Sequence, residues 1–140
     1  MDFELSEDLQ ILQQAAREFA ESELAPRAAK SDAEESFVSE QIALCRDMGF
    51  LGMTVPEAYG GSEVGALGTA VVLMEFNRAC PSTGTTLSVH NSLACESLLR
   101  YGTDEQRQRY LPKLASGEML GAYALSEADS GSDAGALRCK

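Results

Sequence analysis

Apolar side chains recur at steps of three to five residues along most of the first 118 positions, with charged side chains between them. This spacing is typical of amphipathic helices that bury one face. Capping residues at the starts, and glycine or proline at the ends, divide the pattern into separate helices. The sequence therefore predicts helices over about residues 6–26, 39–48, 66–80, 83–101 and 103–117.

Local signals suggest where these helices begin and end. Pro26 is expected to end or kink the first helix, because proline removes a backbone donor and clashes with the preceding turn. Residues 31–36 are polar and are expected to form a loop. Gly49 stands where a left-handed residue closes the second helix. Thr103 and Gln106 have the spacing of a capping box at the start of the fifth helix.

The third and fourth predicted helices differ in their charge pattern. The third has an apolar side facing the core and a charged side facing water: Leu67, Ala70, Val71 and Met74 on the first, Glu75 and Arg78 on the second. The fourth lies in a stretch without any charged residue between Arg78 and Glu96. A helix without a charged face is usually buried, so we expect this one to be central and surrounded by the others.

The pattern changes after residue 118. Met119 to Leu125 is an uncharged apolar run broken by Gly121, which predicts a buried strand. Ser130-Gly131-Ser132-Asp133 follows with residues typical of a turn. The hydroxyl and amide groups of such a turn can donate to an oxygen-rich ligand, and glycine lets a backbone approach one closely. An ordinary acidic surface turn is the alternative interpretation.

Composition narrows the class of protein. A chain of 140 residues with 44% hydrophobic content can bury one core. The net charge of −11 argues against nucleic-acid binding, which requires clustered Lys and Arg. The acidic start lacks the basic residues of a signal peptide, and no uncharged stretch approaches the ~20 apolar residues of a membrane span. The four cysteines have no CxxC spacing, so a zinc site is not expected. We expect free buried thiols in a reducing cytoplasm at all four positions: Cys45, Cys80, Cys95 and Cys139.

Several motifs resemble the acyl-CoA dehydrogenase family over the whole chain. Leu125-Ser126-Glu127-x-x-x-Gly131-Ser132-Asp133 is similar to the family's flavin-binding signature. The stretches 55–61, 87–92 and 101–106 resemble its helical domain, in the same order. Ala128 departs from the pattern, since many members carry proline there. The resemblance implies a mainly α fold, with residues 1–118 as the N-terminal helical bundle and residues 119–140 as the first strand and start of an incomplete β-domain.

The resemblance also implies FAD as cofactor, an acyl-CoA substrate and α,β-dehydrogenation of the thioester. An electron-transferring flavoprotein is then the expected electron acceptor, and the full-length protein is expected to be a cytoplasmic homo-oligomer. The residues expected to contact FAD lie in the signature stretch: Tyr123, Ala124, Leu125, Ser126, Gly131 and Ser132. Ser126 is expected near the pyrimidine edge of the flavin, and Ser132 beside the CoA part of the substrate.

Thr85, Val89 and Leu93 are spaced i, i+4, i+8 and share one face of the fourth helix. By resemblance that face borders the acyl pocket. The local sequence is most similar to the short-chain members of the family, which favours a short acyl group as substrate. Simple core packing of Val89 and Leu93 is the alternative. His90 is the single histidine, and a structural role is favoured because no carboxylate or cysteine partner lies within sequence reach.

The catalytic base is expected beyond Lys140, because the family's glutamate base usually lies in a C-terminal helical domain. Glu127 matches the signature glutamate and is not that base. By itself the chain is therefore expected to be inactive. Two alternatives stay open: another flavoenzyme on this scaffold, such as an acyl-CoA oxidase or nitroalkane oxidase, and a non-enzymatic helical interaction module.

Overall fold

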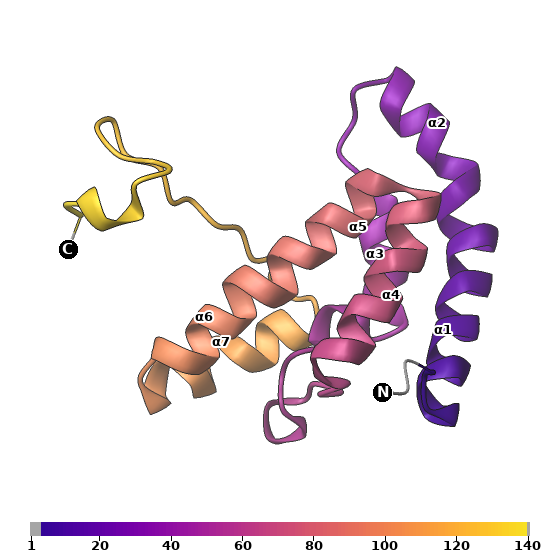
Figure 1. Ribbon diagram of the computed structural model, residues 1–140, viewed down its shortest axis with the longest axis horizontal. Coiled ribbons are helices and arrows are strands. Elements are labelled where there is room, and N and C mark those ends of the chain that lie inside the picture. Colours follow the sequence, from indigo (N-terminus) through magenta and orange to yellow (C-terminus); the bar gives the residue numbers. More distant parts are fainter. Residues whose placement is uncertain (1–3, 140) are drawn as a thin grey trace.

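The computed structural model describes residues 4–139, which form a helical bundle followed by an extended segment and a loop (Figure 1). No strand forms within these residues. The α-helices are α1 (Glu7–Phe19), α2 (Ala25–Ala33), α3 (Ser39–Asp47), α4 (Gly65–Ala79), α5 (Pro81–Ser88), α6 (Glu96–Tyr101) and α7 (Asp104–Ala115). Two π-helical segments, η1 (Ala20–Leu24) and η4 (Val89–Cys95), join α1 to α2 and α5 to α6. Short 3₁₀ turns are η2 (Phe50–Gly52), η3 (Glu57–Tyr59) and η5 (Ala134–Ala136).

Two clusters of buried side chains hold the bundle together. In the larger, the rings of Phe19, Phe50 and Phe76 meet at centroid distances between 4.8 and 5.6 Å, which joins α1, η2 and α4. The smaller packs α7 against η4 and the loop before η3, through Val55, Cys95, Leu111, Leu114 and Ala115. Burial of these apolar surfaces is the main stabilising contribution, and the expected mainly α bundle is confirmed.

Two of the predicted helix boundaries are confirmed by their local geometry. Gly49 follows α3 with φ 79°, in the left-handed region that other residues disfavour. The capping box closes the start of α7. There the Gln106 amide donates to Thr103 Oγ1 at 3.2 Å, and the Thr103 amide donates to Gln106 Oε1 at 2.8 Å.

Pro26 was expected to end or kink the first helix, and the structure has the kink: α2 is inclined to α1 (Figure 1). The chain does not leave the helix at Pro26 but passes through η1 into α2, and Pro26 lies in the first turn of α2. Residues 31–33, expected in a loop, form the last turn of α2.

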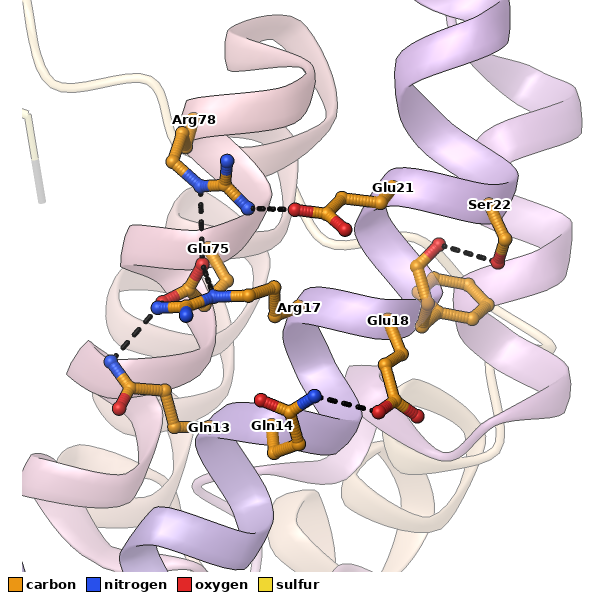
Figure 2. A network of polar contacts seen from close by, with 9 residues as sticks. Gln13, Gln14, Arg17, Glu18, Glu21, Ser22, Glu75 and Arg78 are labelled. Atoms are coloured by element: carbon orange, nitrogen blue, oxygen red, sulfur yellow. Dashed lines mark hydrogen bonds and ion pairs between the residues drawn. The ribbon is translucent and has the colours of Figure 1, made fainter.

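The buried face of α4 was also predicted wrongly, by one position. Leu67 and Met74 are 57% and 68% exposed, whereas Glu75 is only 4% exposed. The stripe that faces the bundle consists of Gly68, Val71, Val72, Glu75 and Phe76. Periodicity fits both stripes, and Glu75 was expected on the side facing water because it is charged. Glu75 is buried at low cost because Arg17 and Arg78 donate to it (Figure 2).

The uncharged fourth helix is not surrounded on every side. The run α5–η4–α6 buries Leu87, His90 and Asn91 on one face, but Thr85 and Leu93 are exposed on another. Its buried polar side chains do find partners, as expected: the Asn91 amide donates to the Phe50 and Leu87 carbonyls at 3.1 Å each. The lack of charge therefore indicates a helix with one solvent-exposed face of neutral side chains.

The strand predicted at Met119–Leu125 does not form. This segment is extended but unpaired, and Met119, Leu120, Tyr123 and Leu125 are all 40–48% exposed. A strand exists only through hydrogen bonds to a neighbour, and no other part of residues 4–139 lies extended beside it.

Three of the four cysteines are buried as expected, but Cys139 is exposed; all four are free thiols. No group of His, Cys, Asp and Glu within residues 4–139 is arranged to hold a metal ion. In the same part of the chain, no helix has the length and apolar character needed to cross a membrane.

Candidate functional site

The extended segment at residues 119–126 presents unused backbone groups next to exposed apolar side chains. The Gly121 amide donates to His90 Nδ1, whereas the amides of Ala122 to Ser126 have no acceptor within the described chain. Tyr123 and Leu125, within this stretch, are 48% and 40% exposed. Unpaired amides beside apolar side chains suit a flat, hydrogen-bonding ligand or another strand.

The loop after Ser126 is closed on itself. The Glu127 amide donates to the Ser130 carbonyl at 2.7 Å, and Ser130 Oγ donates to the Asp133 carbonyl. The Glu127 carboxylate then accepts the amides of Arg138 at 2.9 Å and Cys139 at 2.8 Å. These two backbone donors lower the pKa of Glu127. Both carboxylate oxygens are thus used to hold the loop, in keeping with the prediction that Glu127 is not the base.

The two serines of the signature remain accessible on this loop. Ser126 Oγ lies close to Gly131, where an added Cβ would be 3.4 Å away, in ordinary van der Waals contact. Ser126 and Ser132 are exposed, and neither hydroxyl has a partner among residues 4–139. Free hydroxyls and free amides on one short stretch are the donor set that the carbonyl and phosphate groups of FAD would need.

The predicted substrate residues lie apart from this loop. Thr85 is on α5, and Val89 and Leu93 are on η4; Leu93 is 38% exposed and neither of the latter belongs to a core cluster. Core packing therefore does not account for Leu93. Figure 1 shows the extended segment that follows α7 running away from the bundle, so the helix face and the signature loop form two separate surfaces.

His90 is buried, as its structural interpretation required. Its Nε2 lies 3.1 Å from the Leu51 carbonyl, and its Nδ1 accepts the Gly121 amide at 2.9 Å. Burial lowers the pKa of the imidazole, which favours the neutral ring. The expectation of no cysteine partner was wrong, since Cys95 Sγ lies 3.6 Å from Nε2. The π-helical turn of η4 brings these two residues together.

Sequence reasoning missed a hollow of about 520 Å³ between the start of α4 and the η4–α6 turn. Its walls are mostly small or apolar, with two carboxylates at the edge: Thr54, Glu63, Gly65, Ala66, Thr69, Ala70, Leu73, Ser92, Glu96 and Leu99. The available signal was the run of small residues at the start of α4, which leaves space against a neighbouring helix. None of the predicted site residues lines it.

Comparison with known proteins gives a consistent family. Residues 6–118 match the family model described as "Acyl-CoA dehydrogenase, N-terminal domain". The chain is 40% identical to the acryloyl-CoA reductase (NADH) of Anaerotignum propionicum over 99% of its own length and 35% of that protein. It is 44% identical to the human short-chain specific acyl-CoA dehydrogenase, over 95% of this chain and 32% of that one.

Solved structures agree with this assignment. The fold matches a chain from a structure described as the electron transferring flavoprotein of Acidaminococcus fermentans, with a TM-score of 0.91 and 37% identity. That match covers 99% of this chain and 36% of the other. The chain thus spans about a third of the length of the relatives it matches.

Proposed function

Since this chain belongs to the family of acyl-CoA dehydrogenase N-terminal domains, we propose that the intact protein is an FAD-dependent enzyme acting on acyl-CoA thioesters. The reaction removes a proton from the α-carbon and a hydride from the β-carbon, leaving an α,β-unsaturated thioester. When bound, FAD supplies the hydride acceptor. This chain contributes one wall of the flavin site and one wall of the acyl pocket.

The observation that supports the flavin wall best is the open donor set on residues 122–132. The amides from Ala122 to Ser126 and the hydroxyls of Ser126 and Ser132 are free of partners in the described chain. We assign Tyr123, Ala124, Leu125, Ser126, Gly131 and Ser132 to FAD contacts. A donor from Ser126 toward the pyrimidine edge would favour negative charge on that edge.

The acyl wall is assigned to the exposed neutral face of the α5–η4 run. Thr85 and Leu93 are exposed on that face, and Val89, spaced four residues from each, is half-buried. A neutral, partly apolar face suits a hydrocarbon chain, and Ser132 is assigned to the CoA side. The similarity to relatives that are named short-chain specific acyl-CoA dehydrogenases favours a short acyl group as the substrate of this protein.

The base that removes the α-proton is not assigned to any residue here. Glu127 is held by two backbone amides, and Glu75 is paired with Arg17 and Arg78. A carboxylate engaged in this way is a poor proton acceptor, because its neighbours stabilise the charged form. The electron acceptor is proposed to be an electron-transferring flavoprotein.

The similarity to an acryloyl-CoA reductase favours a second direction for the same chemistry. Reduction of an unsaturated thioester adds hydride to the β-carbon and a proton to the α-carbon. The residues assigned above would serve either direction, because binding and orientation are shared. The partner that delivers or removes electrons would set the direction.

A steady-state assay of the intact protein tests this proposal. Straight-chain acyl-CoA thioesters of increasing length are supplied with an artificial electron acceptor, and the unsaturated product is identified by mass spectrometry. We expect turnover that is fastest for short chains. Oxygen consumption with peroxide formation would instead indicate an acyl-CoA oxidase, and turnover of nitroalkanes a nitroalkane oxidase. Absence of both flavin and turnover would favour an interaction module.

A further inference from the structure

His90 connects three parts of the chain through its two ring nitrogens. A backbone amide can only donate, so His90 Nδ1 must accept from Gly121, at 2.9 Å. The ring proton then resides on Nε2 and is donated to the Leu51 carbonyl, at 3.1 Å. The ring is fully buried. It therefore links the η2 turn, the η4 segment and the extended segment, and one tautomer is required for both bonds.

Gly121 is the point at which the extended segment touches the helices most closely. A Cβ at this position would lie 2.4 Å from the Ala94 Cβ and 3.4 Å from His90 Nδ1. Any side chain larger than hydrogen would thus push the segment away from η4. Glycine is needed here because of this close approach, and the approach brings the amide within reach of the imidazole.

Beyond Gly121 the segment makes no further hydrogen bond to the bundle within residues 4–139. The polar contacts of residues 127–139 are made within their own loop. Upstream, the Met119 amide donates to the Lys113 carbonyl at 3.0 Å at the end of α7. The contact between His90 and Gly121 is therefore the final hydrogen bond before the signature residues begin.

Both His90 and Asn91 lie on the π-helical segment η4, and both side chains are fully buried. The Asn91 amide donates to the Phe50 carbonyl, and Thr54 Oγ1 donates to the Asn91 carbonyl at 3.0 Å. The loop at residues 50–54 is thereby fixed to η4, and it holds the carbonyl that orients the imidazole. Such π-helical turns are often found at functional sites.

We propose that His90 is a positioning residue for the flavin wall: it fixes the point at which the signature segment leaves the helical bundle, through its bond to the Gly121 amide. This inference rests on the proposed function, because the segment is assigned to FAD. His90 itself touches neither cofactor nor substrate in this account. It acts by holding the free amides and hydroxyls of residues 122–132 at one distance from the exposed face of α5 and η4.

Two substitutions at His90 separate its two bonds. In His90→Asn the shorter side chain can place an amide oxygen near the position of Nδ1 and keep an acceptor for Gly121. In His90→Gln the longer side chain can place an amide nitrogen near the position of Nε2, so it keeps the donor to Leu51 and loses the acceptor. The readouts in the intact, FAD-loaded protein are amide hydrogen exchange at Gly121 and the rate of FAD release on dilution.

We expect His90→Gln to speed both exchange at Gly121 and FAD release about three- to tenfold, which corresponds to the loss of one hydrogen bond. His90→Asn should stay closer to wild type in both measurements. Val72→Ala is the matched control: it removes buried volume from the larger core cluster, which includes neither His90 nor Gly121, and lowers general stability. It should leave Gly121 exchange and FAD release close to wild type at temperatures well below its unfolding transition.

A second pair of variants keeps the test decisive if His90→Gln does not fold. Gly121→Ala should reproduce the faster FAD release by clashing with Ala94, and adding Ala94→Gly should restore the wild-type rate. FAD release at the wild-type rate in both His90→Gln and Gly121→Ala would overturn the inference while leaving the proposed function intact. A wild-type protein that binds no FAD would instead contradict the proposed function, whatever the exchange at Gly121 shows.

Discussion

The Arg17 guanidinium on α1 makes a two-pronged contact with the Glu75 carboxylate on α4: Nη2 lies 2.8 Å from Oε1, and Nε lies 3.1 Å from Oε2. Gln13 donates to the same carboxylate, and Arg78 connects it to Glu21 (Figure 2). A bidentate contact of this kind fixes the relative orientation of the two side chains as well as the distance between them. It sets the register of α1 against α4, the helix pair that carries two of the three packed phenylalanines.

Replacing Glu75 by glutamine should therefore destabilise the bundle. We expect Glu75→Gln to lower the free energy of unfolding of residues 1–140 by about 1.5–3 kcal/mol, since hydrogen bonds to a charged group are lost. Chemical denaturation checks this. Glu40→Gln is the matched control, because the pair of Glu40 with Arg27 is exposed and should change stability by less than about 0.5 kcal/mol. Equal effects of the two substitutions would contradict the role given to Glu75.

Acidification should destabilise the chain in two stages. Burial lowers the pKa of His90 below its usual 6.5. As the pH falls below 6.5, the unfolded chain therefore binds a proton at His90 more readily than the native imidazole does. Hydrogen bonds from Arg17, assisted by Arg78, lower the pKa of Glu75 below 4.5, so its contribution is full above 4.5 and is lost as pH falls further. Both shifts therefore remove stability on the acid side.

The first stage can be assigned because His90 is the single histidine of the chain. Below about pH 6.5 the free energy of unfolding should begin to fall, with a slope of at most about 1.4 kcal/mol per pH unit from this one group. His90→Asn should flatten this part of the profile and leave the part below pH 4.5 unchanged. A histidine variant with an unaltered profile would mean that His90 titrates normally in the fold.

Leu93 offers a test of the acyl wall. Because it is partly exposed, Leu93→Ala should change the stability of residues 1–140 by less than the 2–5 kcal/mol typical of a buried leucine. In the intact protein it should shift catalytic efficiency toward longer acyl-CoA thioesters, each extra methylene in the enlarged space being worth roughly 0.8 kcal/mol. Profiles across chain lengths that coincide for wild type and variant would remove Leu93 from the pocket.

Ser126 tests the flavin wall at one hydroxyl. A donor at the pyrimidine edge stabilises the negative charge that collects there on reduction, so Ser126→Ala should lower the reduction potential and slow single-turnover reduction. The expected loss is about 1.5–3 kcal/mol, the value of one hydrogen bond to a charged acceptor. Ser132→Ala is the contrast and should mainly weaken substrate binding. An unchanged potential and rate in Ser126→Ala would mean that this hydroxyl does not reach the flavin.

Signals that act within one turn of chain were readable from the sequence. Gly49 and the pair Thr103–Gln106 work through their own neighbours, so their chemistry is visible locally. The burial of Glu75 was not readable, because its partner Arg17 lies 58 positions away and only the folded chain brings them together. The strand at 119–125 failed for the same reason: its pattern is apolar, but pairing requires a second extended segment.

Only part of the candidate site could be predicted from the sequence. The signature residues are recognisable by motif, and their exposure and free donors agree with a binding role. The link between His90 and Gly121 could not be predicted, because the two residues lie 31 positions apart and only the folded chain brings them together. The small-residue run at the start of α4 was visible, but the hollow beside it depends on how η4 and α6 pack.

The most direct test of the central claim is the visible absorption spectrum of the intact protein, recorded before and after anaerobic addition of butyryl-CoA. We predict stoichiometric bound FAD whose absorbance is bleached by the thioester. Residues 1–140 alone, treated with FAD and desalted, should retain no stoichiometric flavin, because one wall of a site binds weakly. A colourless intact protein that takes up no FAD, or a flavin that no acyl-CoA reduces, would contradict the account.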